Sequence, residues 1–111
     1  MKKYSAEFSG EDWNICGIKD RSPLKIAWAR TSVTPEREVL HYHLTGHEYY
    51  MVSKGCIRVQ VENTTVDVRE NEMLYVEPRE RHAIVEVLEP AEYIVINTNP
   101  DPNDKVIFRD R

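Results

Sequence analysis

The feature that most constrains this chain is a period-two alternation of apolar residues in short segments separated by turns. Such alternation is typical of strands with one buried face, and helical periodicity is hard to find. Short, continuously apolar segments lie between them, as expected of strands covered on both faces. The alternating segments are 24–29, 56–61, 66–68 and 83–87, and the continuous ones are 49–52, 73–76 and 93–96. Several short strands at this spacing predict an all-β sandwich or barrel.

The length of 111 residues predicts one domain, residues 1–111, with its own core. We expect the barrel core at about residues 24–97, followed by a loop and a short apolar segment within 98–111. That last segment, 106–108, is interpreted as an edge strand or as a tail that docks on a partner. The absence of any linker or repeat gives no reason to expect a second domain.

Charge and hydropathy exclude several classes of partner. The net charge is −4 and no basic stripe is present, so nucleic-acid binding is not expected. The apolar runs are too short to cross a membrane, and the N-terminal residues lack the apolar stretch of a secretory signal. A cytoplasmic location is therefore expected, with Cys16 and Cys56 as free, buried thiols.

The most informative residues are three histidines and a carboxylate within residues 41–48. If a strand covers this segment, His41 and His43 point to the same face. A turn at Thr45-Gly46 then returns the chain and brings Glu48 close to that pair. Two imidazoles and a carboxylate form a facial ligand set for Fe, Mn, Ni, Co or Zn with open coordination positions. The alternative is a pair of surface histidines without a metal.

These residues resemble the first motif of the cupin superfamily. The motif is a glycine, five residues, HxH, three or four residues, Glu, six residues and a glycine. Here it reads Pro35, five residues, His41-Tyr42-His43, four residues, Glu48, six residues, Gly55. Only the leading glycine is replaced. The resemblance covers roughly residues 24–97 and implies a small single-domain cupin, an antiparallel double-stranded β-helix or jelly-roll barrel.

A second cupin motif is similar in spacing but altered in sequence. It is matched by Asn71, five residues, Glu77-Pro78-Arg79, two residues, His82, three residues and Glu86. The two glycines, the proline and the asparagine of the family are substituted, and Asn71 can replace a glycine because asparagine tolerates positive φ. The resemblance implies that His82 completes a metal site with His41, His43 and Glu48.

Strand parity assigns orientations to two neighbouring residues. His47 precedes Glu48 and is expected on the opposite face, at the surface or an interface, unless a bulge exchanges the two. Glu86 shares the parity of His82 and is expected to point inward, as a partner of a ligand histidine or as a general base. The alternative places Glu86 in water at the mouth of the barrel.

Aromatic residues are the other candidates for the pocket. Tyr50 has the parity of Glu48 and is expected to line the pocket, whereas Trp28 is expected in the core. Tyr75 and Tyr93 could add phenols, although tyrosines in strands usually serve packing.

Cupin relatives include dioxygenases, isomerases, lyases, ligand sensors and storage proteins, so the resemblance does not determine one activity. The first hypothesis is a metal-dependent, dioxygenase- or isomerase-like enzyme for a small organic substrate that coordinates the metal, with Glu86 or Tyr50 moving protons. The second is a non-catalytic small-molecule binding or sensor module, and the third is a purely structural metal. A homodimer is expected because it would cover exposed strand edges, with residues 106–108 as the candidate contact.

Overall fold

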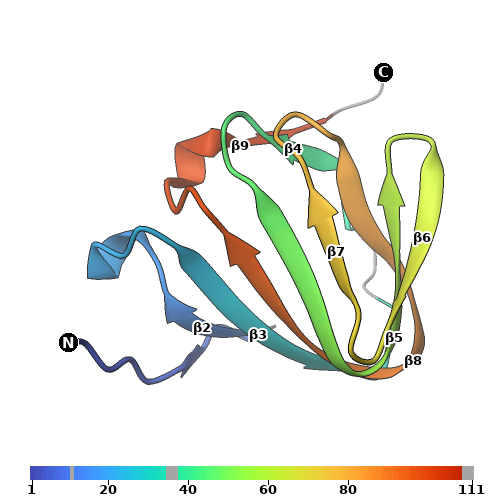
Figure 1. Cartoon of the computed structure of the whole chain (residues 1–111), viewed down its shortest axis with the longest axis horizontal. Helices are drawn as coiled ribbons and strands as arrows, with labels where there is room; N and C mark the ends of the chain where they lie inside the picture. The colour runs from blue at the N-terminus through green and yellow to red at the C-terminus, as the bar shows by residue number, and fades with distance from the viewer. Residues whose placement is uncertain (11, 35–37, 109–111) are drawn as a thin grey trace.

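The computed structural model of the chain describes residues 1–10, 12–34 and 38–108. These residues form nine strands and two short 3-10 helices (Figure 1). Pro35, the first position of the proposed motif, lies outside the described residues. The elements are β1 (Glu7–Phe8), β2 (Trp13–Cys16), η1 (Ile18–Asp20), β3 (Lys25–Thr31), β4 (His41–His43), β5 (Glu48–Val61), β6 (Thr64–Arg69), β7 (Met73–Val76), β8 (His82–Asn97), η2 (Pro102–Asp104) and β9 (Lys105–Ile107).

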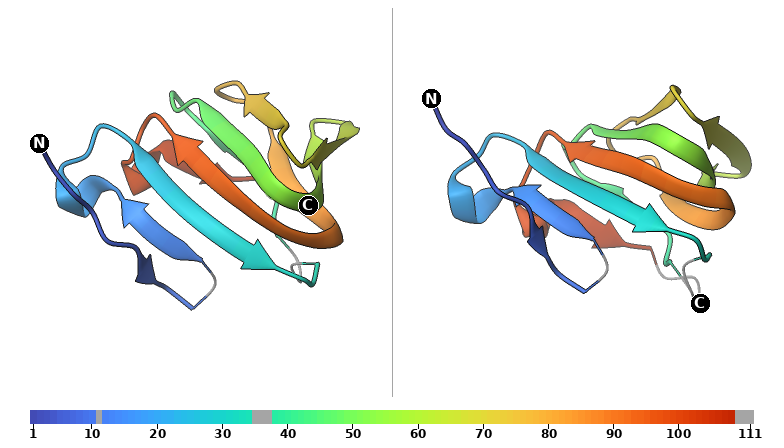
Figure 2. Two further views of the ribbon diagram at one scale, coloured as in Figure 1. Left: turned by 60° about the horizontal axis from the view of Figure 1, so that its bottom comes forward. Right: turned by 90° about the horizontal axis from the view of Figure 1, so that it is seen from below.

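Two long strands, β5 and β8, hold the molecule together because each takes part in both halves of one nine-stranded sheet. The early half of β5 pairs with β7 and with the late half of β8, which continues to β3, β2 and β1. The late half of β5 pairs with β6 and with the early half of β8, which meets β4, and β4 pairs in turn with β9. All pairings are antiparallel, and Figure 2 shows the strands curling around a common interior. The predicted all-β jelly-roll architecture is confirmed.

The apolar core lies between the two halves of the curled sheet. It is built from alternate residues of the long strands, as the period-two pattern predicts. Its most buried members are Val52, Ile57, Val59 and Val76, each at most 1% exposed. Cys16 and Cys56 are buried and free, as expected.

The expectation that Trp28 belongs to the core is wrong. Ala27 and Ala29 point inward and are each 7% exposed, so Trp28 between them points outward. There its ring packs 5.9 Å from the ring of Trp13 on β2, and the Arg30 guanidinium lies 5.2 Å above it. Small side chains on the inner face of β3 leave room for a cavity, and the large aromatic ring is covered by the neighbouring strand instead.

Positive φ angles occur at three of the motif positions. Gly55 has φ +78°, and a Cβ atom there would overlap the carbonyl group of Pro90. Asn71 and Arg79 have φ 68° and 70°, so both adopt the left-handed conformation that a glycine adopts without strain. The turns of the second motif are therefore kept although its glycines are replaced.

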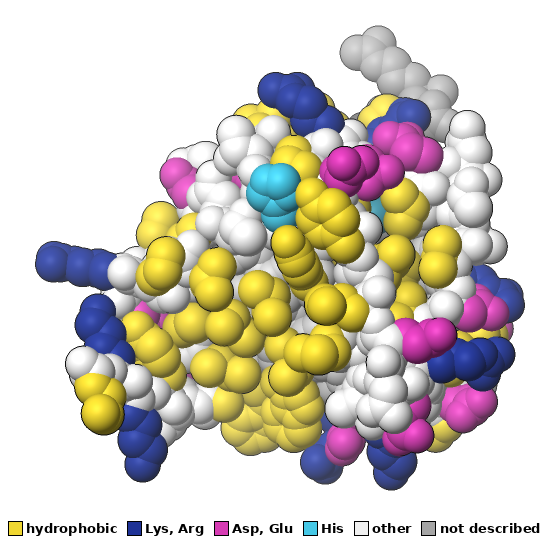
Figure 3. All heavy atoms as spheres, in the orientation of Figure 1, with side chains coloured by type: hydrophobic (Ala, Val, Ile, Leu, Met, Phe, Trp, Pro, Cys, Tyr) yellow, Lys and Arg dark blue, Asp and Glu magenta, His cyan; other side chains and the backbone are white. Residues whose placement is uncertain are grey.

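The outer face of β3, β8, β5 and β7 is strongly apolar. Met51, Met73 and Tyr75 are 39%, 59% and 44% exposed on these strands. Figure 3 shows apolar side chains gathered over this side of the molecule. We refer to it below as the outer apolar face.

The C-terminal segment is an edge strand. Strand β9 pairs with β4, and the Phe108 ring lies 4.7 Å from the guanidinium of Arg81. Of the two interpretations of residues 106–108, the structure shows the edge strand within the same chain. No helix among the described residues is long and apolar enough to cross a membrane.

Candidate metal centre

The β4–β5 hairpin brings three of the predicted ligands together. His41 and His43 lie at either end of the three-residue strand β4, and Glu48 is the first residue of β5. The turn between them is held by Asp104, which accepts hydrogen bonds from the backbone N–H of Thr45 at 3.0 Å and of Gly46 at 2.9 Å. By holding this turn, the carboxylate of Asp104 fixes the position of Glu48 relative to the two histidines.

His82 enters from the opposite strand. It is the first residue of β8 and lies directly opposite His41 in the β4–β8 pairing. The loop before it is fixed by the backbone N–H of Arg79, which donates to the carbonyl of His43 at 2.7 Å. The left-handed turn at Arg79 makes this bond possible, so the altered second motif still places its histidine beside the first.

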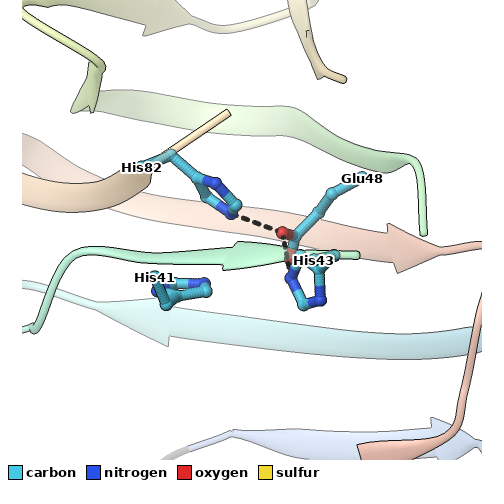
Figure 4. A group of neighbouring side chains, drawn as sticks. All are labelled: His41, His43, Glu48 and His82. Carbon is cyan, nitrogen blue, oxygen red and sulfur yellow. Dashed lines mark hydrogen bonds and ion pairs between the residues drawn. The ribbon is translucent and has the colours of Figure 1, made fainter. Parts of the chain in front are cut away.

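The four side chains converge, as Figure 4 shows. One donor atom from each lies within 4.8 Å of all the others. The Oε2 atom of Glu48 is 2.9 Å from Nε2 of His43 and 2.6 Å from Nε2 of His82. The predicted set of His41, His43, Glu48 and His82 is therefore brought together by the fold.

Backbone carbonyls orient two of the imidazoles. The Nδ1 atom of His41 is 3.1 Å from the carbonyl of Val39, and that of His82 is 2.9 Å from the carbonyl of Glu80. A carbonyl only accepts, so Nδ1 carries the hydrogen in both rings. The Nε2 atoms are left to act as ligands, which is the usual role of such supporting bonds at metal sites.

The electrostatics favour the metal-binding forms of Glu48 and His41, whereas His82 must lose a proton to bind a metal. Burial alone would raise the pKa of Glu48, but the hydrogen bonds from His43 and His82 outweigh it and lower that pKa to about 2. Burial, together with the nearby charge of His82, lowers the pKa of His41 to about 4. Burial opposes protonation of His82 as well, but its bond to Glu48 raises the pKa of that imidazole. At neutral pH the carboxylate is ionised and His41 is neutral.

This donor set fits a divalent transition metal. Two donors on opposite sides of such an ion are about 4 Å apart, and the four donors here span up to 4.8 Å. Three imidazole nitrogens and one carboxylate oxygen suit Fe, Mn, Co, Ni or Zn rather than Ca or Mg. An ion at this point would take the place of the protons that now bridge Glu48 to its two histidines.

A cavity of about 800 Å³ is lined by three of the four donor residues, His41, His43 and Glu48, while His82 is fully buried behind them. Tyr50 lies in its wall, as predicted, and is only 3% exposed. Burial, with the charges of Glu48 and Glu38, raises the pKa of Tyr50 well above its ordinary value. Tyr93 also lines the cavity, whereas Tyr75 lies on the outer apolar face. The phenol of Tyr50 therefore stays protonated at physiological pH.

The predicted inward orientation of Glu86 is wrong. In the β5–β8 pairing Arg58 is opposite Glu86 while the next residue, Val59, is opposite Ile84. Val85 is thus an extra residue, a β-bulge, and it reverses the parity after Ile84. The Glu86 side chain is 48% exposed, and its carboxylate lies 3.3 Å from Nη1 of Arg58 on the outside of the barrel.

The parity prediction for His47 is confirmed. Its side chain lies outside the cavity, with Nδ1 at 2.6 Å from the hydroxyl of Tyr75. The two rings are stacked with their centroids 5.8 Å apart. No bulge exchanges His47 with Glu48, so His47 is not part of the donor cluster.

Several polar residues of the cavity were missed from the sequence, among them Glu38 and Asn97. Glu38 faces the cavity from the segment before β4, and burial followed by the charge of Glu48 raises its pKa. Asn97 is 4% exposed and lies opposite Glu48 in the β5–β8 pairing. The parity of Tyr93 and Val95 could have identified Asn97, but Glu38 lies outside any strand and has no periodicity to read.

Comparison with known proteins agrees with this geometry. The Cupin_2 family, described as "Cupin domain", matches residues 30–97. No curated protein matches the chain significantly. Among solved structures, a variant of Bacillus subtilis oxalate decarboxylase is 16% identical with a TM-score of 0.69, covering 95% of this chain and 30% of that one. A variant of Streptomyces PAC13 with uridine is 12% identical with a TM-score of 0.75, covering 98% and 91%.

A third similar structure is described by the name of this fold. It is a Klebsiella pneumoniae protein with a double-stranded beta-helix domain, 13% identical with a TM-score of 0.71, covering 96% of this chain and 92% of that one. These identities are low, so the likeness concerns the fold, and the chain spans only 30% of the oxalate decarboxylase. With its double-stranded β-helix, its converging donors and a family match over residues 30–97, the chain belongs to the cupin family.

Proposed function

We propose that this cupin binds one divalent transition metal and is a dioxygenase- or isomerase-like enzyme for a small organic substrate. The observation that carries this proposal is the convergence of four donor atoms, three of whose residues line a cavity of about 800 Å³. A cavity of that size is typical of small-molecule sites. Iron, manganese, nickel, cobalt and zinc all suit the donors.

When bound, the metal would act as a Lewis acid that polarises a substrate oxygen. The chain itself supplies two groups for protons in the cavity wall. The protonated Tyr50 can donate a hydrogen bond to an oxygen on which negative charge develops. Glu38, whose pKa is raised, can accept a proton from a substrate carbon beside a carbonyl and return it to the neighbouring carbon.

The two reaction classes differ in their need for dioxygen. An isomerase moves a proton within the substrate and consumes no other reactant, with Glu38 as the carrier. A dioxygenase takes both atoms of dioxygen into the product while the substrate is oxidised. Ala27, Ala29 and Val95 add apolar side chains to the cavity wall in either case.

The test is a substrate screen of gently purified, unchelated protein, with elemental analysis of the same sample. Diketones, diols and hydroxyketones are incubated with and without dioxygen, and oxygen consumption and product formation are both followed. Turnover that requires the bound metal and is lost in His41→Ala supports the proposal. A metal-loaded wild type that converts none of these compounds would contradict the enzymatic part of it.

A binding or sensor module is the second candidate function. The outward position of Glu86 favours it, because the cavity then has one acid fewer for proton transfer. In that case a compound from the screen raises the melting temperature of the metal-loaded protein without being converted. Turnover of the same compound would exclude this alternative.

We also propose that the chain forms a homodimer, through the outer apolar face in place of residues 106–108, because residues 105–107 pair with β4 of the same chain. Large exposed apolar surfaces usually mark contact sites, and Met51, Met73 and Tyr75 are exposed there. A sedimentation experiment with Met73→Lys tests this contact. Val85→Lys is the control, because Val85 is exposed in the early half of β8 and lies outside this face. A dimer that survives Met73→Lys unchanged would remove this face from the interface.

A further inference from the structure

Two lysines stand beside the proposed metal centre through the strand registers. Lys105 on β9 lies directly opposite His43 on β4. Lys25 on β3 lies opposite Asn97 on β8, and Asn97 lies opposite Glu48 on β5. Directly opposite residues of an antiparallel pair point to the same side of the sheet, with Cβ atoms about 5 Å apart. Both lysines therefore extend from the same inner surface as the metal ligands.

Neither lysine forms an ion pair with a carboxylate of the residues that the structure describes, 1–10, 12–34 and 38–108, although other basic side chains there are paired. The charge of Lys105 is near enough to lower the pKa of both Glu38 and His41. The acids that share the cavity are Asp12, Glu38 and Glu48, and the hydroxyl of Ser9 already donates to Asp12 at 2.8 Å.

The lysines also mark the junction of two cavities. A second cavity of about 580 Å³ lies between the N-terminal segment, η1 and the loop at residues 99–102. Four residues line both this cavity and the 800 Å³ cavity beside the metal ligands: Lys25, His43, Asn97 and Lys105. A ligand that reaches from one cavity to the other would lie against these shared residues, and the two lysines are the cationic ones among them.

We propose that the site takes an organic anion, whose carboxylate or phosphate group binds between Lys25 and Lys105 while its other oxygens face the metal ligands. Asn97 also lines both cavities; its Oδ1 atom already accepts a hydrogen bond from the backbone N–H of Asn99 at 2.8 Å, so its amide nitrogen would be the donor to the same molecule. Larger substituents would extend into the second cavity. This inference names the substrate class of the proposed enzyme and rests on that proposal.

Calorimetric titration of the metal-loaded wild type tests the inference with defined probes. Succinate, inorganic phosphate and the neutral analogue succinamide are compared at low and high salt. The anions should bind at least about tenfold more tightly than succinamide, because a hydrogen bond to a charged group is stronger than a neutral one. The preference for anions should decrease with salt. Tighter binding of phosphate than of succinate would identify a phosphate ester, and the reverse a carboxylate. Equal affinity for succinate and succinamide, or no measurable binding of either anion, would overturn the inference.

Lysine variants locate the contact. Lys25→Gln and Lys105→Gln should each weaken anion binding about ten- to a hundredfold, and Lys25→Arg should restore most of it. Lys54→Gln is the matched control, since it removes the same charge from an exposed position of β5 that lines neither cavity. Anion affinities of the two cavity variants equal to that of Lys54→Gln would contradict the proposal.

Metal content separates this inference from the proposed function. Each variant is analysed for metal before titration, and a variant that keeps its metal but loses the anion supports the lysine site alone. If the wild type holds no metal, the proposed function fails. Anion binding to the metal-free chain should then still depend on Lys25 and Lys105, and its independence of both lysines would overturn the inference separately.

Discussion

His41 and His82 lie directly opposite each other across the β4–β8 pairing, with their imidazole centroids 4.3 Å apart. They are 41 positions apart in the chain, and the fold alone makes them neighbours. The cross-strand contact joins the first motif to the altered second motif. The arrangement of the four donors therefore depends on the register of the short strand β4 against its neighbours β8 and β9.

Loss of any one ligand should reduce metal content sharply. We expect near-stoichiometric metal in the wild type and a small fraction of it in Glu48→Gln and His82→Ala, because both remove a buried donor. Elemental analysis after dialysis measures this. His47→Ala is the matched control, since His47 lies outside the cavity. Equal metal in His82→Ala and His47→Ala would show that His82 is not a ligand.

Asp104→Asn should destabilise the hairpin that carries the ligands. Burial raises the pKa of Asp104, but hydrogen bonds from Gly46 and Thr45 outweigh it and lower that pKa. The variant leaves one backbone donor unsatisfied, at a cost of about 1–3 kcal/mol. Because the folded-state pKa is lowered, the stabilisation by Asp104 is present above the ordinary aspartate pKa and is lost as the pH falls through the folded-state value.

Urea unfolding at neutral and at acid pH measures this difference. The gap between the wild type and Asp104→Asn should narrow as the pH falls, and Glu70→Gln, an exposed acid on another turn, should show no gap. A gap that stays constant with pH would contradict the role given to the ionised carboxylate.

Gly55→Ala should be much more harmful than Gly10→Ala, although both glycines have positive φ. The angles are +78° and +101°, so both variants incur the strain of a left-handed alanine. Only at Gly55 would the added Cβ also overlap the backbone of Pro90, whereas nothing lies within 4 Å at Gly10. We expect a loss of at least about 3 kcal/mol for Gly55→Ala in thermal or urea unfolding. Similar losses at both positions would show that the positive φ angle at Gly55, and not its close contact with Pro90, makes alanine unfavourable there.

Glu38→Gln should stabilise the metal-free protein at neutral pH. Burial, followed by the charge of Glu48, raises the pKa of Glu38 above 4.5. For an acid with a raised folded-state pKa, the stability of the protein falls as the pH rises from the ordinary pKa through the folded-state pKa. The glutamine variant avoids this loss and is therefore more stable than the wild type above that range. The melting temperature of the chelated protein should therefore be higher in Glu38→Gln at pH 7 and equal to the wild type below about pH 4.

Glu86→Gln is the control for this variant. The pair of Glu86 with Arg58 is exposed, so its loss should change stability by less than about 0.5 kcal/mol. A shift of equal size in Glu86→Gln and Glu38→Gln would contradict the position assigned to Glu38.

The parts of the site that could be predicted from sequence are those governed by local geometry. His41, His43 and Glu48 lie in one hairpin, and strand parity with a short turn is enough to bring them together. The same parity placed Tyr50 in the cavity and His47 outside it, because β5 is regular over these residues. His82 was added by resemblance to a family motif, since no local rule connects it to the hairpin.

Where parity failed, a long-range feature was responsible. Glu86 faces solvent because the bulge at Val85 reverses the alternation, and a bulge is created by the pairing of two strands rather than by either one. At Trp28 the alternation holds and only the choice of the buried face was wrong: Ala27 and Ala29 face the interior, and Trp13 of β2 packs against the outward Trp28 ring.

The alternating pattern by itself determined the all-β class and the hairpin ligands, because side-chain direction within a strand repeats every two residues regardless of what surrounds it. The tertiary structure alone decided the rest. Lys25, Glu38 and Lys105 reach the cavity over His41 through strand pairings and loop paths that join distant segments. Registers between such segments depend on the packing of the whole core, and so they leave no periodic signal in the local sequence.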